Sequence, residues 1–269
     1  MHPILFRWGN HLLYGYSALI YLGIVLGAGY AQWRGYRAGY RATQVLDGAL
    51  WALVGGLVGA RLSYVLPNWA DYAGRPLALL RLWGGGLVFQ GGLLGGTMAL
   101  LLYSLYAELP FARLADVAAP AVALAQGLGW IGALLHGAHY GVILRSPVSM
   151  WLPDIYGVYG PRFPTQLLAA MLGFFLFFTL HRQSRLKLQP GITALLYLLG
   201  NGSGHSLLEF ARADEAPYVG LLRTTQIAEL AEVGIACVLL LYLWLRFRAR
   251  RNLTITDQGG TREAAHGEI

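Results

Sequence analysis

Two histidines stand close together in the stretch GLGWIGALLHGAHYGV, residues 127–142 of an otherwise apolar chain. His136 and His139 are three residues apart, so they share one face if the segment is helical. An imidazole titrates near neutral pH and can take up or release a proton in a reaction. A zinc site needs three or four protein ligands, and nothing nearby supplies a third. The pair therefore indicates acid–base or hydrogen-bonding chemistry, and no metal is predicted.

Other polar residues interrupt long apolar runs. Arg61 lies in GGLVGARLSYVL and Gln90 in GGGLVFQGGLLGG, while His205, Glu209 and Arg212 lie in NGSGHSLLEFAR. An ionisable residue at membrane depth faces a cavity or a partner, so Arg61 either contacts a phosphate or forms a structural pair. The glycines around Gln90 favour close helix packing, but a buried amide needs partners. Glu209 can pair with Arg212 three residues later, as an acid–base group or as a salt-bridged helix end.

The composition is typical of an integral membrane protein. Hydrophobic residues make up 56% of the 269 residues and charged residues 12%, against about 25% charged residues in soluble domains. The net charge of +7 is explained by Lys and Arg flanking membrane helices, so no nucleic-acid partner is predicted. The single cysteine, Cys237, lies in an apolar run and is predicted to be a core residue. The first residues show no removable signal peptide.

Seven apolar runs are long enough to cross a bilayer at about 20 residues per span. They cover residues 12–33, 46–66, 86–107, 116–135, 164–180, 191–208 and 225–246. The sequence thus predicts an all-α membrane domain, residues 1–251, with an outer-face arm over 136–163 and a disordered polar cytoplasmic tail over 252–269. The basic clusters RGYRAGYR, RQSRLK and RFRARR fall on one side, which predicts an outer N-terminus and an inner C-terminus.

The order of the motifs resembles the prolipoprotein diacylglyceryl transferase family. The resemblance extends from about Tyr14 to Arg246 and rests on six motifs: YGYSALIYLG, GARLSYVL, GGLVFQGGLLGG, GLGWIGALLHGAHYG, FPTQLL and EFAR. It implies seven spans and no cofactor. It also implies transfer of a diacylglyceryl group from phosphatidylglycerol, or another phospholipid, to the cysteine thiol of a preprolipoprotein signal peptide. The expected location is the bacterial plasma membrane, and a membrane-protein partner is a further possibility.

Several polar positions of the family motifs carry other residues in this chain. The glycine frame of the signature is kept as Gly129, Gly132 and Gly141, and EFAR keeps Glu209, Phe210 and Arg212. The replaced positions are Gln90 and Phe163 for His, Trp130 and His205 for Arg, Ala133 and His136 for Asn, and Ala138 for Glu. Three functions remain open. The chain is a transferase with a rearranged site, or a catalytically degenerate lipid-binding paralogue that acts as a scaffold or partner subunit, or an enzyme of related chemistry with another acceptor or headgroup.

For the transferase, the resemblance assigns three residues to catalysis and six to the lipid and its phosphate. The predicted catalytic residues are His205, His136 and Gln90, with His205 or His136 as the base. The predicted lipid- and phosphate-binding residues are Arg61, Trp130, Gly132, His139, Glu209 and Arg212. The chemistry behind this assignment is that a departing phosphate needs donors or cations beside it, and an attacking thiol needs a base.

Overall fold

The computed structural model describes residues 4–8, 11–81, 85–183, 186 and 188–266. In this part of the chain, seven helices of 18 residues or more lie where the apolar runs predict spans. They are α1 (Gly15–Arg37), α2 (Ala42–Val65), α4 (Phe89–Tyr106), α5 (Phe111–His136), α6 (Thr165–Gln183), α7 (Ile192–Glu209) and α8 (Thr224–His266). The predicted positions agree with these helices to within a few residues at most ends, because apolar content and helix length are both local properties.

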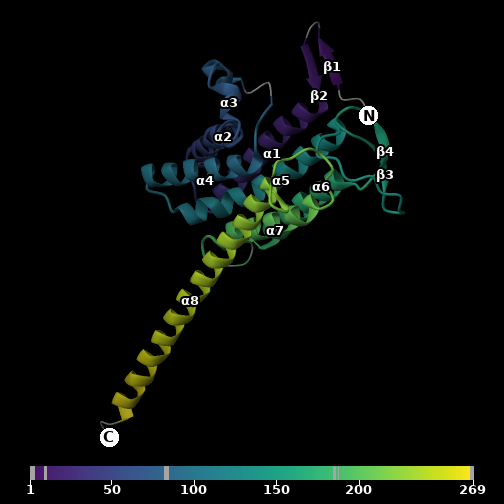
Figure 1. Cartoon of the computed structure of the whole chain (residues 1–269). Helices are drawn as coiled ribbons and strands as arrows, with labels where there is room; N and C mark the ends of the chain where they lie inside the picture. Colours follow the sequence, from purple (N-terminus) through teal and green to yellow (C-terminus); the bar gives the residue numbers. More distant parts are fainter. Residues whose placement is uncertain (1–3, 9–10, 82–84, 184–185, 187, 267–269) are drawn as a thin grey trace.

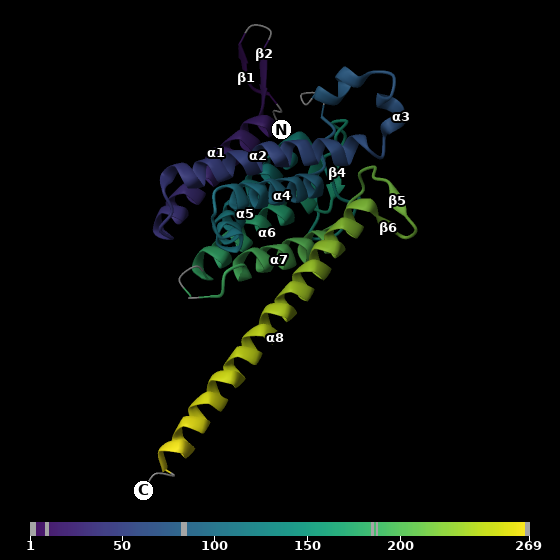
Figure 2. The same ribbon diagram turned by 90° about the vertical axis from the view of Figure 1, so that its left-hand side faces the viewer.

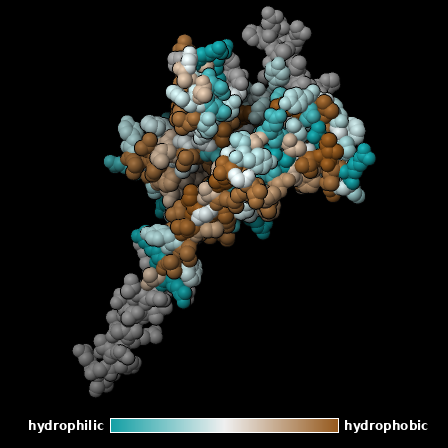
Figure 3. All heavy atoms as spheres, viewed as in Figure 1, coloured by the Kyte–Doolittle hydropathy of each residue, from teal (hydrophilic) through white to brown (hydrophobic). Residues whose placement is uncertain are grey.

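Four of the described helices are long and apolar enough to cross a membrane: α2, α5, α6 and residues 224–249 of α8. Large apolar side chains are exposed along these helices, and Figure 3 shows apolar residues gathered on the helical bundle. The prediction that Cys237 is a core residue is wrong, since its side chain is exposed on α8. Only 11% of the apolar window of α8 is buried. An apolar residue on a membrane helix can face lipid as readily as protein.

The connections contain short antiparallel hairpins, so the chain is not purely helical. Strands β1 (Ile4–Trp8) and β2 (His11–Tyr14) precede α1, which begins at Gly15 and not at the predicted residue 12. Strands β3 (Met150–Pro153) and β4 (Tyr159–Arg162) form the arm between α5 and α6, and β5 (Tyr218–Val219) pairs with β6 (Leu222–Arg223) before α8. Helix α3 (Trp69–Tyr72) and the 3-10 helix η1 (Pro76–Leu80) lie between α2 and α4. Backbone pairing in hairpins satisfies donors and acceptors that an irregular loop would leave open.

Glycines let α2 and α4 pack at very short range. A Cβ built on Gly59 would lie 2.3 Å from the carbonyl oxygen of Gly91, and one on Gly95 would lie 2.3 Å from that of Gly55. Small residues at membrane helix interfaces allow backbones to approach in this way. The motif GGLLGG is therefore explained by helix packing, and it aligns the start of α4, where Gln90 lies, with α2.

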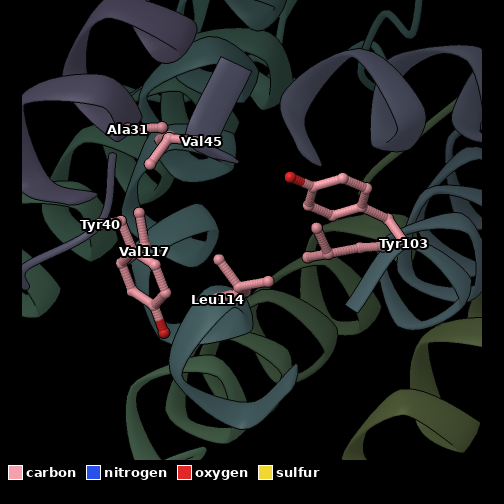
Figure 4. Packing of buried hydrophobic residues seen from close by; sticks show 8 residues of the cluster. Ala31, Tyr40, Val45, Tyr103, Leu114 and Val117 are labelled. Carbon is pink, nitrogen blue, oxygen red and sulfur yellow. The ribbon is translucent and has the colours of Figure 1, made fainter. Parts of the chain in front are cut away.

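A core of buried apolar residues joins α1, α2, α4 and α5 near the turns that follow α1 and α4. Figure 4 shows its side chains converging from these helices. The cluster consists of Ala31, Tyr40, Val45, Leu100, Tyr103, Leu114, Val117 and Ala121. Tyr103 also donates a hydrogen bond from its hydroxyl to the carbonyl oxygen of Gln44, at 2.9 Å. This core stabilises one end of the bundle, and the polar residues lie at the opposite end.

Helix α8 leaves the bundle at an angle and extends well beyond it, as Figures 1 and 2 show. Its first turns pack against α7, where the absence of a side chain on Gly202 leaves room for the α8 backbone: a Cβ there would lie 2.6 Å from the Glu229 carbonyl oxygen. The helix runs to His266, into the segment 252–269. The assignment of that segment to a separate cytoplasmic tail stays a prediction.

Candidate functional site

The glycines of the stretch 127–142 allow the chain to turn out of α5 and back against the arm. Gly137 ends α5 with a φ of 79°, and a Cβ there would lie 2.4 Å from the Asp154 carbonyl oxygen. A Cβ on Gly141 would lie 2.1 Å from the carbonyl oxygen of Phe163. Both positions require glycine because backbone occupies the space of a side chain. Gly137 and Gly141 therefore shape the loop that carries His139, whereas a Cβ on Gly129 of the glycine frame would meet no atom within 4 Å.

Two side chains of the motif FPTQLL form hydrogen bonds to the backbone of this loop. The Thr165 hydroxyl donates to the carbonyl oxygen of His139 at 2.8 Å, and the Gln166 amide donates to that of Ala138 at 2.9 Å. Both side chains are almost completely buried, with 1% of each residue exposed. Because a buried polar group left without a partner is costly, these bonds help to fix the loop backbone.

The same loop pairs with the segment after α7. The amide of Val142 donates to the carbonyl oxygen of Ala211, and the amide of Ala213 donates to that of Tyr140, both at 2.9 Å. Gly141 and Arg212 face each other across this bridge. Residues about 70 positions apart in the sequence are thus brought together, and His139 lies beside Arg212.

Four charged side chains form an ionic cluster at this end of the bundle, in which Glu209 and Arg223 are buried and Arg212 and Asp214 are partly exposed. Arg212 donates to Glu209 and to both carboxylate oxygens of Asp214, and Arg223 donates to Glu209 at 3.4 Å and to Asp214 at 3.1 Å. The predicted pairing of Glu209 with Arg212 is confirmed. Two guanidinium groups and two carboxylates balance in charge, which is the condition for burying ions at tolerable cost. The cluster is therefore a structural element first.

The ionic cluster also controls the charge of Asp214. Burial by itself would raise the pKa of this carboxyl group. Its hydrogen bonds outweigh burial and hold the pKa well below its usual range, with Arg212 donating to both carboxylate oxygens. Asp214 is therefore ionised at every pH at which the protein is expected to work, and it balances Arg212 and Arg223.

The hydrogen bonds of His139 determine which ring nitrogen carries its proton. Nδ1 lies 2.7 Å from Nη2 of Arg212 and 3.3 Å from the Asp214 carboxylate. A guanidinium group only donates and a carboxylate only accepts, so one nitrogen cannot satisfy both. The shorter contact makes Nδ1 an acceptor, and the proton of the neutral ring then lies on Nε2. His139 can thus offer an N–H group that no described side chain occupies.

Three aromatic rings converge beside the ionic cluster. The Trp130 ring stacks on His205 with 5.2 Å between ring centres and 18° between planes, and it meets His139 edge-on at 5.2 Å. His205 is buried, with 6% of the residue exposed. Trp130 is therefore in contact with both imidazoles. We call Trp130, His139 and His205 the ring cluster.

A network of buried amides lies behind His205. Gln126 on α5 donates to Asn201 at 2.8 Å and contacts Nε2 of His205 at 3.1 Å, and it accepts from the Tyr197 hydroxyl at 3.1 Å. Asn201 in turn donates to Glu232 of α8 at 3.0 Å. A second acid on α8, Glu229, accepts from Gln90 at 3.2 Å through Oε1, whereas its buried Oε2 has no partner among the described residues. Gln90 thus has the partner that its burial requires.

Two other predicted site residues, Arg61 and His136, form contacts of their own outside the ring cluster. The Arg61 guanidinium donates to the carbonyl oxygens of Ala78, Leu79, Gly85 and Gly86 at 2.8–3.1 Å, so it holds the connection between α2 and α4. A cavity of about 220 Å³ lies beside it, lined by Arg61, Tyr64, Tyr72, Ala78, Arg81, Gly85 and Gly86. His136 is exposed at the end of α5 and stacks on Tyr16 of α1, which also packs against Gly132. Among the described residues, no group of three or more His, Cys, Asp or Glu side chains is arranged to hold a metal ion.

Comparison with known proteins agrees with this arrangement of motifs. The model of the family described as prolipoprotein diacylglyceryl transferase matches residues 3–244. The chain belongs to the prolipoprotein diacylglyceryl transferase family.

Relatives in this family match most of the chain at about 30% identity. A phosphatidylglycerol–prolipoprotein diacylglyceryl transferase of Synechocystis is 30% identical over 257 residues, which cover 90% of this chain and 89% of the relative. The enzyme of the same name from Clostridium tetani is 31% identical over 234 residues, covering 86% and 93%. A transferase numbered 2 from Clostridium perfringens is 31% identical over 216 residues, covering 80% and 84%.

Motif reasoning for the prolipoprotein diacylglyceryl transferase family named the residues of the ring cluster, Glu209 and Arg212, and did not name the residues that contact them. The missed set is Gln126, Tyr197, Asn201, Asp214, Arg223, Glu229 and Glu232. Two of these left a signal in the sequence, because Glu229 and Glu232 interrupt a predicted span and intramembrane acids rarely lack a function. The amides left none, since an isolated Asn or Gln in an apolar run does not reveal its partners.

Proposed function

We propose that this chain is a phosphatidylglycerol–prolipoprotein diacylglyceryl transferase of the bacterial plasma membrane. The observation that supports the proposal is the ring cluster: Trp130 contacts His139 of the signature loop, which Thr165 and Gln166 hold, and it stacks on His205 of α7. Membership of the family and the names of its relatives supply the reaction. The degenerate scaffold has no observation in its favour.

In this reaction the cysteine sulfur attacks the glycerol carbon that carries the phosphate ester. A C–S bond forms, the C–O bond to phosphate breaks, and glycerol phosphate leaves with the electron pair. The thiol proton passes to a base. Negative charge therefore grows on the phosphate oxygen during the step, and fixed hydrogen-bond donors beside it lower the barrier.

In this proposal, neutral N–H donors contact the phosphate in place of the family arginines that Trp130 and His205 replace. The guanidinium groups of Arg212 and Arg223 are committed to Glu209 and Asp214, so their direct task is to place His139. With Nδ1 accepting from Arg212, His139 offers Nε2–H to the phosphate. Trp130 supports both imidazoles from the side and confines their rings.

The proton of the thiol goes to His136 in this scheme. This imidazole is exposed at the end of α5 and forms no hydrogen bond with the described residues, so both nitrogens are open to a substrate. Its stacking on Tyr16 orients the ring without occupying a lone pair. General-base catalysis of this kind contributes about 10²–10⁴-fold to a rate.

The proposed topology has seven spans, an outer N-terminus and a cytoplasmic C-terminus. The charge bias of the connecting segments and the position of the seven long helices support it. Under this topology the ionic cluster and the arm lie at the outer face, where a prolipoprotein would present its cysteine. A reporter fused after Arg251 is expected to behave as cytoplasmic, and periplasmic activity at that position would contradict the topology.

The test is conversion of a lipobox peptide by the purified protein in bilayers of phosphatidylglycerol, followed by mass spectrometry. The Cys237→Ser variant serves as the background throughout, because it leaves the peptide as the only source of thiol. The expected product is a peptide heavier by one diacylglyceryl group, with glycerol phosphate released in equal amount. A peptide with Ser in place of Cys should give none.

Two variants then assign the roles. His139→Ala is expected to lower the rate by about 10²–10³-fold, the usual cost of a preorganised donor, and His136→Ala by about 10²–10⁴-fold. Absence of product from the intact protein, with phosphatidylglycerol still bound, would overturn the transferase. It would leave the lipid-binding paralogue as the function of this chain.

A further inference from the structure

In the buried amide network behind His205, each hydrogen bond has a defined donor and acceptor. The end of the network that is farthest from His205 is an acid on another helix. The network runs from Glu232 of α8 through Asn201 of α7 and Gln126 of α5 to Nε2 of His205, with Tyr197 as a side branch. Asn201 and Tyr197 are almost fully buried, with 1% and 2% of each residue exposed. Nothing in the motifs or in the family comparison assigns a role to Glu232.

The direction follows from which atoms donate and which accept. A carboxylate only accepts, so Asn201 turns its Nδ2 towards Glu232 and its Oδ1 towards Gln126. Gln126 must then present its amide nitrogen to Asn201, and its Oε1 accepts from the Tyr197 hydroxyl. The second hydrogen of that amide nitrogen points to His205, so Nε2 of His205 accepts it at 3.1 Å. A neutral ring whose Nε2 accepts carries its proton on Nδ1.

We propose that Glu232 is a positioning residue that fixes His205 as the neutral tautomer with its proton on Nδ1. His205 then offers an N–H donor to the substrate and is not the base, since the lone pair of Nε2 is occupied. The use of this donor by a substrate phosphate rests on the proposed transferase function. The tautomer itself does not.

The same side chains can form a second network when no acceptor holds Asn201. Asn201 would donate to Oε1 of Gln126, the Gln126 amide would donate to the Tyr197 hydroxyl, and Nε2 of His205 would become the donor. Both networks satisfy the same buried groups, so they differ little in energy unless an outside group selects one. Glu232 is that group, and it reaches the bundle only because the first turns of α8 pack against α7.

The tautomer can be measured directly by ¹⁵N NMR of histidine-labelled protein in bilayers, because protonated and unprotonated imidazole nitrogens resonate far apart. A His205→Asn variant identifies the His205 signals. The expected result for the intact protein is a protonated Nδ1 and an unprotonated Nε2. In Glu232→Leu, a signal from protonated Nε2 should appear. In Glu232→Gln, whose amide can donate as well as accept, signals from both tautomers should appear.

Two further variants keep the test decisive. Glu229→Leu makes the same replacement three residues earlier on α8, outside this network, and should leave the His205 signals unchanged. Gln126→Glu is equal in size to the original side chain and puts an acceptor opposite Nε2, so it should move the proton to Nε2 even if Glu232→Leu fails to fold. A protonated Nε2 in the intact protein, or an unchanged tautomer in folded Glu232→Leu, would overturn the inference, and so would an unchanged tautomer in Gln126→Glu.

Transferase activity, measured beside the tautomer, distinguishes a failure of the Glu232 assignment from a failure of the proposed transferase function. In the peptide assay, Glu232→Leu should lower kcat by up to the ~10²–10³-fold that loss of a whole donor costs, with a smaller change in KM, and Glu232→Gln should lower kcat less. If the intact protein shows the Nδ1 tautomer but no transfer, the transferase is wrong and the tautomer assignment stands. If transfer occurs and Glu232→Leu changes neither tautomer nor kcat, the role of Glu232 is wrong.

Discussion

Replacement of Gly95 by alanine should weaken the contact between α2 and α4 severely, whereas the same change one turn earlier should not. A Cβ on Gly95 would lie 2.3 Å from the Gly55 carbonyl oxygen and 2.9 Å from the Gly59 Cα. On Gly92 the nearest atom would be 3.4 Å away, which is ordinary contact. Both neighbours of Gly95 are backbone atoms, so no side-chain rotation can relieve the overlap.

The size of the effect follows from the distance that the helices must move. To restore ordinary contact at Gly95, α2 and α4 must move apart by about 1 Å. A gap of that size forfeits roughly a quarter to a half of the dispersion energy between facing atoms, and overpacking in general costs about 1–3 kcal/mol. At about 2–4 °C per kcal/mol for a chain of this size, Gly95→Ala should lower the midpoint of thermal unfolding by ~2–12 °C.

The measurement is the temperature at which half of the detergent-solubilised protein is lost from its monodisperse chromatographic peak. Gly92→Ala is the matched control on the same helix. Gly29→Ala, where a Cβ would meet no atom within 4 Å, controls for helix propensity and should gain up to about 1 kcal/mol. Equal midpoints for Gly95→Ala and Gly92→Ala would show that backbone overlap at Gly95 does not limit the approach of α2 and α4, and would refute the reasoning.

Three other predictions concern stability. Because the folded pKa of Asp214 is held below its unfolded value of about 3.9, its stabilising contribution is complete above that value and is lost as the pH falls further towards the folded pKa. Thermal midpoints measured across pH 7 to 3 should therefore drop below about pH 4, and the drop should be smaller in Asp214→Asn; equal drops would argue against it. Arg61→Met removes the donor to four carbonyl groups and should destabilise by at least ~2 kcal/mol, with faster proteolysis between α2 and α4, while exposed Arg75→Met should change neither. Gln166→Leu leaves the Ala138 carbonyl without its donor and should cost about 1–3 kcal/mol in unfolding experiments; an unchanged midpoint would mean that packing alone holds the loop.

The positions of the long helices could be predicted because each depends on its own residues. An apolar run of about 20 residues forms a helix in a membrane whatever its neighbours are, so residues 46–66 and 116–135 already indicate α2 and α5. Arg61 could be recognised as unusual in the same way. Its partners could not, because carbonyl groups from Ala78 to Gly86 exist in every sequence and give no signal.

Side-chain partners depend on how the helices pack, and sequence patterns do not contain that information. The pairing of Glu209 with Arg212 was predictable, since a spacing of three residues on one helix fixes their distance. The contact of Gln126 with His205 joins residues 79 positions apart, and that of Asn201 with Glu232 joins α7 to α8. The distances between these side chains depend on how closely the glycine-lined helices pack. The residue types of the site can therefore be predicted from the sequence. The proton positions on His139 and His205 cannot, because they follow from contacts that exist only after the helices have packed.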